Sequence, residues 1–217
     1  VFSSTLTGSR VKETVHRTIR WLDRCLLAHE RPDEQSIFPI VQDSLNPELR
    51  SEYARQLIKW EEVCAVRGFF YFNGGESKDY FWRMVHFSTN ILPKNKPRYL
   101  MGVGFAIDLI ACSALGIDMY DCVFPTRTFG YAVMKTGQLN LKTCKTYSRT
   151  YLHQIATVET VSCHLLTVHN IAFQIKLMIK EQRFPRFIQD YMLIIYPNED
   201  YPTWIINALQ AVNVTLL

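Results

Sequence analysis

Apolar and polar positions near the start of the chain repeat at helical spacing. The apolar stripe comprises Val11, Val15, Ile19, Leu22 and Leu26. Ser9 stands just before the stripe, where a serine hydroxyl can accept hydrogen bonds from the free N–H groups of a first turn. The pattern therefore predicts an amphipathic helix over residues 9–28.

Short apolar runs alternate with helical patterns over the first 124 residues. The runs predict strands at residues 37–41, 68–72, 99–103 and 118–124. Between them, helices are expected from the Asn-Pro-Glu start at residues 46–48, over residues 77–91 and over residues 106–115. Strict alternation of strands and helices indicates a parallel sheet. From residue 148 to residue 196 the pattern is mainly helical.

The parallel sheet can be doubly wound or part of a barrel. Four strands cannot close an eight-stranded barrel, and an isolated half would leave strand edges and apolar surface exposed. The pattern therefore leaves two interpretations, an open sheet or the second half of a barrel whose first half lies upstream of Val1.

Composition narrows the class of protein only modestly. With 48% hydrophobic and 20% charged residues, the 217-residue chain can form a substantial core, and wholesale disorder is excluded. The net charge of +4 is compatible with a polyanionic partner without demonstrating one. Scattered cysteines such as Cys112, which lies in an apolar run, indicate a reduced, intracellular protein. Without a signal peptide or a membrane-length apolar run, a soluble protein is expected.

Functional residues of parallel α/β proteins gather where strands end. The candidates are Gln42, residues 73–75, residues 102–104 and Asp121. On spacing alone, Asp121 is either a structural carboxylate or a catalytic one. The Gly-Val-Gly of residues 102–104 lacks the third glycine of a dinucleotide fingerprint.

Two other groups stay ambiguous from spacing alone. Arg127 follows the last strand and either reaches a phosphate or base edge or remains an exposed loop arginine. His164 and His169, with Cys144 upstream, do not make a zinc site by themselves, because a structural zinc needs four ligands.

Several motifs together resemble one enzyme family. They are Lys-Pro-Arg-Tyr-Leu-Met-Gly-Val-Gly (residues 96–104), Asp-Met-Tyr-Asp-Cys-Val-Phe-Pro-Thr-Arg (residues 118–127) and Leu-Thr-Val-His-Asn-Ile-Ala (residues 166–172). Arg-Trp-Leu-Asp-Arg-Cys (residues 20–25), Gly-Gly-Glu-Ser-Lys (residues 74–78) and Pro-Thr-Trp (residues 202–204) also fit. The chain thus resembles the catalytic subunit of eukaryotic queuine tRNA-ribosyltransferases, the tRNA-guanine transglycosylases.

The resemblance implies a fold and a domain division. The expected fold is α/β, the C-terminal half of a TIM-type (β/α)8 barrel with a zinc-binding insertion and C-terminal helices. Residues 1–128 would form the βα units of that half-barrel, and residues 129–217 the zinc-binding subdomain with the C-terminal helices.

The resemblance also implies a reaction. Asp121 would be the nucleophile that attacks the ribose of guanosine 34 in tRNAs with a GUN anticodon (those for Asp, Asn, His and Tyr). Guanine would leave, and queuine would replace it through a covalent Asp–ribose intermediate. Gln42 would hydrogen-bond the incoming base, and Met101 would stack on it.

Further residues, a cofactor and partners follow from the resemblance. The tRNA-binding residues would be Gly102, Val103, Gly104, Phe105, Ala106, Ile107, Asp108, Thr126, Arg127 and Thr128. Cys144 and His169 would bind a structural Zn²⁺. The expected partners are tRNA, the queuine or guanine base, and a second subunit, in a homodimer or in a heterodimer with a non-catalytic homologue. The expected location is the cytoplasm, with association with the mitochondrial outer membrane as a further option.

The chain departs from the family pattern at four places. The general base belongs to a first half-barrel that is not in the sequence, and two zinc cysteines before Cys144 are absent. Asp43-Ser44 replaces a Gly-Gly pair after Gln42, and residues 70–73 replace a Gly-Gly-Leu turn. These departures keep open the alternative of a catalytically impaired tRNA-binding or partner subunit. A generic barrel hydrolase that acts on a small substrate is a third hypothesis.

Overall fold

Strands and helices alternate in the computed structural model as the sequence pattern predicts. The structure describes residues 9–41, 47–59, 69–71, 77–127, 142–156, 160–178 and 184–216. The alternating part consists of α1 (Ser9–Leu27), β1 (Ile40–Val41), α2 (Pro47–Ile58), β2 (Phe69–Tyr71), α3 (Lys78–Ile91), β3 (Tyr99–Met101), α4 (Ala106–Ala114) and β4 (Met119–Asp121). The later part consists of α5 (Phe124–Arg127), α7 (Lys142–Thr146), α8 (Arg149–Ala156), α9 (Thr160–Met178), α10 (Phe184–Ile195) and α11 (Thr203–Gln210).

The four strands form one parallel sheet in chain order, β1-β2-β3-β4. Leu100 on β3 pairs with Phe70 on β2 and with Tyr120 on β4, so these positions share one face. This arrangement confirms the prediction of a parallel α/β sheet. Each strand is shorter than its apolar run, because only two or three residues of each run form the sheet ladder.

Local sequence signals account for the helix ends. The Ser77 hydroxyl accepts a hydrogen bond from the backbone N–H of Tyr80 and thereby caps α3. Pro47 is the first residue of α2, where its missing N–H removes no helical hydrogen bond. Gly116 follows α4 with a φ of 96°, a left-handed conformation that glycine adopts without a steric penalty.

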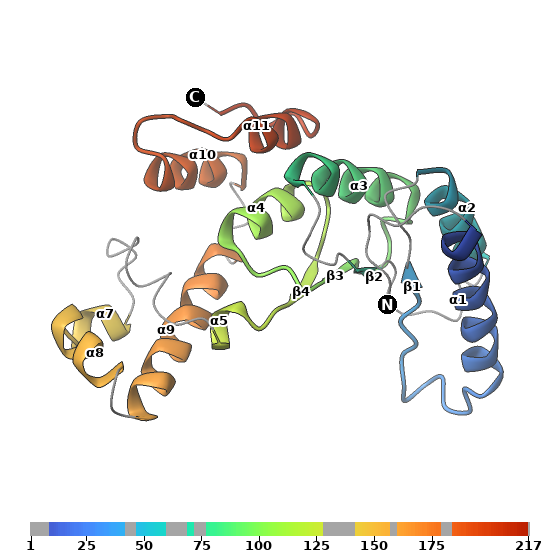
Figure 1. Cartoon of the computed structure of the whole chain (residues 1–217), viewed down its shortest axis with the longest axis horizontal. Helices are drawn as coiled ribbons and strands as arrows, with labels where there is room; N and C mark the ends of the chain where they lie inside the picture. The colour runs from blue at the N-terminus through green and yellow to red at the C-terminus, as the bar shows by residue number, and fades with distance from the viewer. Residues whose placement is uncertain are drawn as a thin grey trace.

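The main core lies between the sheet and the helices α1 to α4. Leu100 is fully buried on the helix-facing side, and Val15 and Tyr53 reach the same cluster from α1 and α2. On the other side of the sheet, Ile40 and Met119 are each 39% exposed. Figure 1 shows α1 to α4 along one side of the strands. The helices of the described part therefore cover one face of the sheet and leave the other face open.

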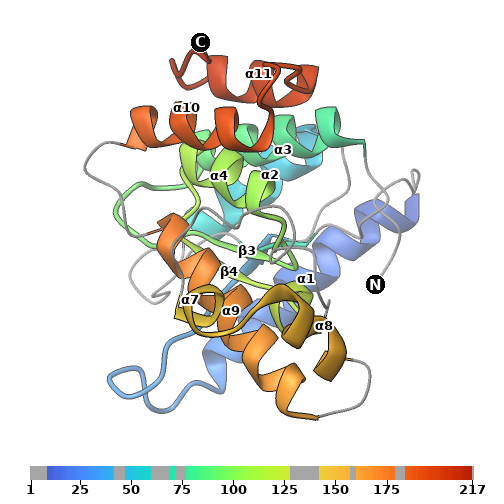
Figure 2. The ribbon, with the colours of Figure 1, turned by 90° about the vertical axis from the view of Figure 1, so that its left-hand side faces the viewer.

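A second core joins the end of the chain to α4. Ile110 and Ala111 on α4 are buried against Ile188 on α10 and Leu209 on α11. In both views α10 and α11 lie outside α3 and α4, whereas α7 to α9 lie beyond the β4 end of the sheet (Figures 1 and 2). The C-terminal helices thus share a core with the predicted half-barrel region. The predicted division at residue 128 stays a prediction.

The strand predicted over residues 118–124 ends early. β4 stops at Asp121, and Phe124 begins the short helix α5. The prediction was wrong at this end, because Pro125 fits the first turn of a helix as well as it ends a strand. Asp121 is therefore the last residue of its strand.

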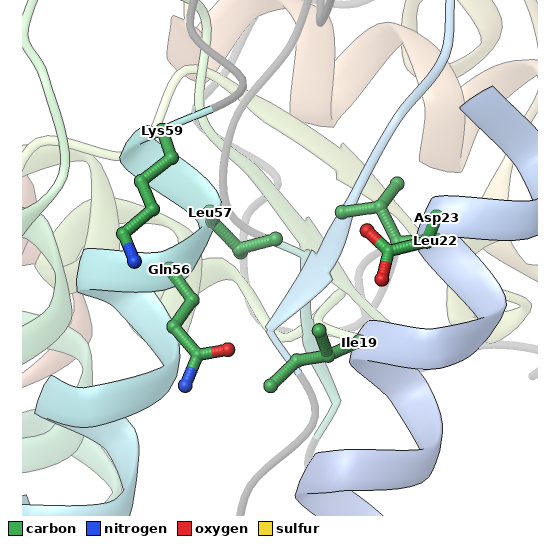
Figure 3. Close-up of a pocket in the computed structure, with 6 residues that line it drawn as sticks. All are labelled: Ile19, Leu22, Asp23, Gln56, Leu57 and Lys59. Carbon is green, nitrogen blue, oxygen red and sulfur yellow. The ribbon is translucent and has the colours of Figure 1, made fainter. Parts of the chain in front are cut away.

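A hollow of roughly 210 Å³ lies between α1 and α2 (Figure 3). Side chains from the two helices face each other across it. The lining residues are Ile19, Leu22, Asp23, Gln56, Leu57 and Lys59. None of the candidate strand-end residues lines this hollow. Within the described ranges, no helix is long and apolar enough to cross a lipid bilayer.

Candidate active site at the carboxyl edge of the sheet

Asp121 lies exposed at the carboxyl end of β4, with Met101 as its neighbour on β3. Because the two residues are register partners, their side chains lie on the same face of the sheet, the one that the helices leave open. The structure thus brings together two of the predicted site residues, the proposed nucleophile and the residue expected to stack on a base.

The backbone of Gly102 holds the Asp121 carboxylate. The Gly102 N–H donates to the backbone oxygen of Asp121 at 2.9 Å and to its Oδ1 at 3.1 Å. Gly102 has a φ of 75°, in the left-handed region that favours glycine. A turn made possible by glycine therefore points a hydrogen-bond donor at the carboxylate.

Tyr99 is a site residue that the sequence analysis did not single out. Its phenol donates a hydrogen bond to Asp121, and its pKa rises to about 12 because of burial and, secondarily, because of that carboxylate. A phenol with this pKa stays protonated at neutral pH and remains a donor. Side chains two residues apart on a strand lie on the same face, so Tyr99 lies on the same face as Met101. This spacing could have identified Tyr99 as a site residue from the sequence.

Gly104 allows the loops after β3 and β4 to touch. A Cβ atom on Gly104 would lie 2.6 Å from both Cβ and Sγ of Cys122. The Cys122 thiol donates to the Gly102 carbonyl at 3.4 Å and accepts from the Phe124 N–H at 3.4 Å. The residue after Asp121 is thereby anchored to the neighbouring loop, which fixes the direction in which β4 ends.

The predicted tRNA-binding stretch 102–108 is only partly accessible. Gly102 and Phe105 are exposed, whereas Val103 and Gly104 are buried. Ala106 and Ile107 pack against the core formed by α4, α10 and α11. Only two of the seven predicted residues thus present a substantial surface to solvent.

Asp108, the last residue of that stretch, is buried beneath Lys78. Its side chain is 5% exposed, and the Lys78 ammonium lies 2.5 Å from its Oδ2. Burial raises the pKa of the Asp108 carboxyl, and Lys78 partly opposes that rise. Lys78 also lies over three aromatic rings, at distances of 5.3 to 5.8 Å from Phe81, Trp204 and Phe105. The pair therefore braces the start of α3 against the start of α4.

Replacing Asp108 by asparagine is expected to change how stability depends on pH. An acid with a raised pKa in the folded state favours folding when protonated, so wild type should lose stability relative to Asp108→Asn as pH rises above about 3.8. Urea unfolding from acid to neutral pH measures the difference in free energy. Asp79→Asn serves as a control of opposite sign, because the Arg83 hydrogen bond lowers the pKa of Asp79. If the difference in free energy of unfolding between wild type and Asp108→Asn does not change with pH, burial does not raise the pKa of Asp108.

Helix α9 supports the end of β4 through α5. The Asn170 side-chain amide donates to the Pro125 carbonyl at 3.0 Å. Thr126 is exposed, and Arg127 ends α5, its side chain lying outside the description. Two of the predicted tRNA contacts therefore sit on a short helix that α9 holds in place.

The predicted zinc ligands lie on two helices that pack together. His169 on α9 is buried, with 1% of its surface exposed, and Cys144 belongs to α7, which packs against α9. The Cys144 side chain lies outside the description. No group of three or more potential metal ligands occurs among the described residues. The donor set in this part of the chain is thus incomplete for a four-ligand zinc site.

Some predicted residues lie where nothing is described. Gln42, Thr128 and the altered Asp43-Ser44 pair all fall outside the described ranges. Their predicted roles stay predictions.

Comparisons with known proteins point to one family. A family model described as queuine tRNA-ribosyltransferase matches residues 1–195. A queuine tRNA-ribosyltransferase catalytic subunit from Caenorhabditis elegans is 47% identical over 85% of this chain. Relatives of the same name from Caenorhabditis briggsae and Schizosaccharomyces pombe are 42% and 40% identical over 97% and 98% of it.

The chain is shorter than these relatives. It covers 53% of the C. elegans protein, 62% of the C. briggsae protein and 61% of the S. pombe protein. The match with the C. briggsae protein extends over 252 residues, which exceeds the 217 residues of this chain. That relative therefore carries internal segments that this chain lacks.

Proposed function

The chain belongs to the queuine tRNA-ribosyltransferase family, whose model covers residues 1–195, and from this membership we propose that the protein exchanges a guanine base in tRNA for queuine. The observation that carries the proposal is the placement of Asp121. This carboxylate is exposed at the carboxyl edge of a parallel sheet, beside Met101 and held by donors from Gly102 and Tyr99.

The proposed fold is the second half of a (β/α)8 barrel. Its support is the parallel strand order β1-β2-β3-β4 together with the open face that carries Ile40 and Met119. Four further strands would cover that face and convert it into a barrel interior. Asp121 would then stand at the rim of the barrel, where the loops after the strands converge.

The proposed chemistry is a double displacement at one sugar carbon. A carboxylate oxygen of Asp121 attacks C1′ of nucleotide 34, and the bond from C1′ to guanine breaks. Guanine leaves with the electron pair and takes up a proton. The ring nitrogen of queuine, which gives up its proton, then attacks C1′ and displaces Asp121. Two inversions retain the configuration of the sugar.

Substrate recognition in this proposal uses both loops at the sheet edge. The target base must leave the anticodon stack to reach Asp121. Met101 would then contact the flipped base, and Gln42 would hydrogen-bond it. The stretch 102–108 and residues 126–128 would contact the surrounding RNA of tRNAs with a GUN anticodon. Because Asp108 is buried against Lys78, its part would be to shape the loop.

Tyr99→Phe is expected to lower kcat by about 10- to 100-fold with little change in KM, because a hydrogen bond to a charged group contributes about 1.5–3 kcal/mol. The hydroxyl orients the carboxylate for attack. Steady-state kinetics of base exchange measure both constants. Tyr80→Phe is the matched control, since Tyr80 is an exposed tyrosine on the helix α3 and not on the sheet. Equal kinetics for wild type and Tyr99→Phe would remove Tyr99 from the positioning of Asp121.

Zinc, the second subunit and the location remain proposals from the family resemblance. His169 and Cys144 would supply two ligands on the packed helices α9 and α7, and bound zinc would stabilise that packing. Two ligands are fewer than the four that a structural zinc takes, so metal analysis of the purified full-length protein decides this proposal: about one zinc per chain would support it, and none would refute it. We also propose that the protein forms a homodimer or a heterodimer with a non-catalytic homologue. The proposed location is the cytoplasm or the mitochondrial outer membrane.

Incorporation of labelled guanine or queuine into an anticodon stem-loop tests the proposed function directly. The full-length protein should exchange the base in RNA with a GUN anticodon and leave a control with a changed first anticodon base unlabelled. An impaired partner subunit would bind the RNA but neither exchange the base nor bind queuine. Failure to bind tRNA at low salt would contradict both the active enzyme and the impaired partner subunit.

A further inference from the structure

Two phenylalanine rings, one from the loop after β3 and one from the start of α5, contact each other beside the candidate active site. Phe105 follows β3 and Phe124 follows β4, and their ring centroids lie 4.5 Å apart. Phe105 is 53% exposed, Phe124 is half-buried, and the two rings are tilted by 44° to each other. An exposed large apolar side chain is common on protein surfaces. A ring supported by a second ring and placed at the functional edge of a sheet is a more specific arrangement.

The pair is tied to the same contact that orients Asp121. Phe105 follows Gly104, which packs on Cys122, and the Phe124 N–H donates to the Cys122 sulfur at 3.4 Å. The rings and the carboxylate are therefore carried by two joined segments, the loop after β3 and the segment from the end of β4 to the start of α5. Any RNA segment that brings a ribose to Asp121 has to pass close to this surface.

Lys78 limits the freedom of the exposed ring. Its ammonium lies 5.8 Å from the centroid of Phe105 while its charge is engaged by Asp108. A cation over a ring face attracts the ring and favours one orientation. Because the Lys78 charge is paired, the surface beside it favours contact with a flat, weakly polar group over contact with a free phosphate.

We propose that Phe105, supported by Phe124, stacks on a tRNA base that adjoins the exchanged nucleotide. This inference rests on the proposed function. When one base leaves the stack, each neighbour loses a stacking partner. An exposed aromatic ring replaces that partner, since every base presents a π face. The pair would thus stabilise the RNA conformation in which the target base is extruded.

The experiment uses anticodon stem-loops with 2-aminopurine immediately 5′ or immediately 3′ of the exchanged base. Stacking quenches the fluorescence of this base analogue. Binding to the full-length wild-type protein should quench one of the two probes, and Phe105→Tyr should keep the quenching. Phe105→Ala and Phe105→Leu should lose it and should bind RNA about tenfold more weakly, as expected when one aromatic–base stack is removed.

Trp21→Ala is the matched control, because Trp21 is also 53% exposed but lies on α1, at the other end of the sheet. It should leave quenching and affinity unchanged. Melting curves establish that each variant is folded. Quenching that persists in Phe105→Ala, or that is absent from both probes with wild type, would overturn the inference. Base exchange by wild type in the same assay would then still support the proposed function, so the two failures are distinguishable.

Discussion

Asp121→Ala is expected to abolish the covalent tRNA–protein adduct and to lower base exchange by on the order of 10³-fold or more. Without the carboxylate, no group on β4 can bond to the sugar while guanine departs. Mass spectrometry of the protein incubated with tRNA detects the adduct, and labelled-base incorporation measures the rate. The effect should be the largest of any single substitution in the described part of the chain, because it removes the reacting atom itself.

Two isosteric variants sharpen this test. Asp121→Asn keeps the shape of the side chain and an acceptor for the Gly102 N–H, yet it should also form no adduct, because an amide is a poor nucleophile. Asp118→Asn is the matched control. Asp118 precedes the same strand and accepts from the Arg98 N–H at 2.9 Å, which an amide oxygen can also do. An adduct in Asp121→Ala would show that another residue is the nucleophile.

Gly104→Ala is expected to lower the free energy of unfolding by about 3 kcal/mol, at the upper end of the usual cost of overpacking. The added Cβ would lie 2.6 Å from two atoms of Cys122, so the loops after β3 and β4 would have to separate. Urea unfolding measures the loss of stability. Because the same contact fixes the end of β4, base exchange should fall even at temperatures where the variant is fully folded.

Gly102→Ala provides the contrast. A Cβ there would meet open space, and the cost of about 1 kcal/mol comes from the left-handed backbone alone. Cys122→Gly combined with Gly104→Ala removes both clashing Cys122 atoms and should recover part of the lost stability. If Gly104→Ala proves no more harmful than Gly102→Ala, steric contact with Cys122 does not set the loop geometry.

The sequence predicted the fold where periodicity and caps agree. The stripe of α1, the Ser77 cap and the Gly116 stop all led to helices within a residue or two of those observed. Alternation of elements led to the parallel sheet. The prediction of where β4 ends was wrong, because Pro125 is compatible with either a strand end or a first helical turn.

The candidate site was predictable only in part. Strand-end logic singled out Asp121 from the residues alone, and the family resemblance assigned Met101 its role. The remaining contacts join residues that are far apart in sequence and meet only in the folded chain, so no local sequence pattern predicts them. Lys78 and Asp108 are 30 residues apart in sequence, and Asn170 reaches Pro125 from 45 residues away. Their partners become visible only when α3, α4 and α9 are placed in space.

The shared core of α4, α10 and α11 has a consequence for biosynthesis. Ile110 and Ala111 become buried only when Ile188 and Leu209 reach them. On the ribosome, α4 and the strands beside it emerge long before those partners, so the apolar face of α4 stays exposed to water until α10 and α11 have been synthesised. A premature stop codon after α9 would therefore damage a distant part of the molecule, and the nascent chain should depend on chaperones during that interval.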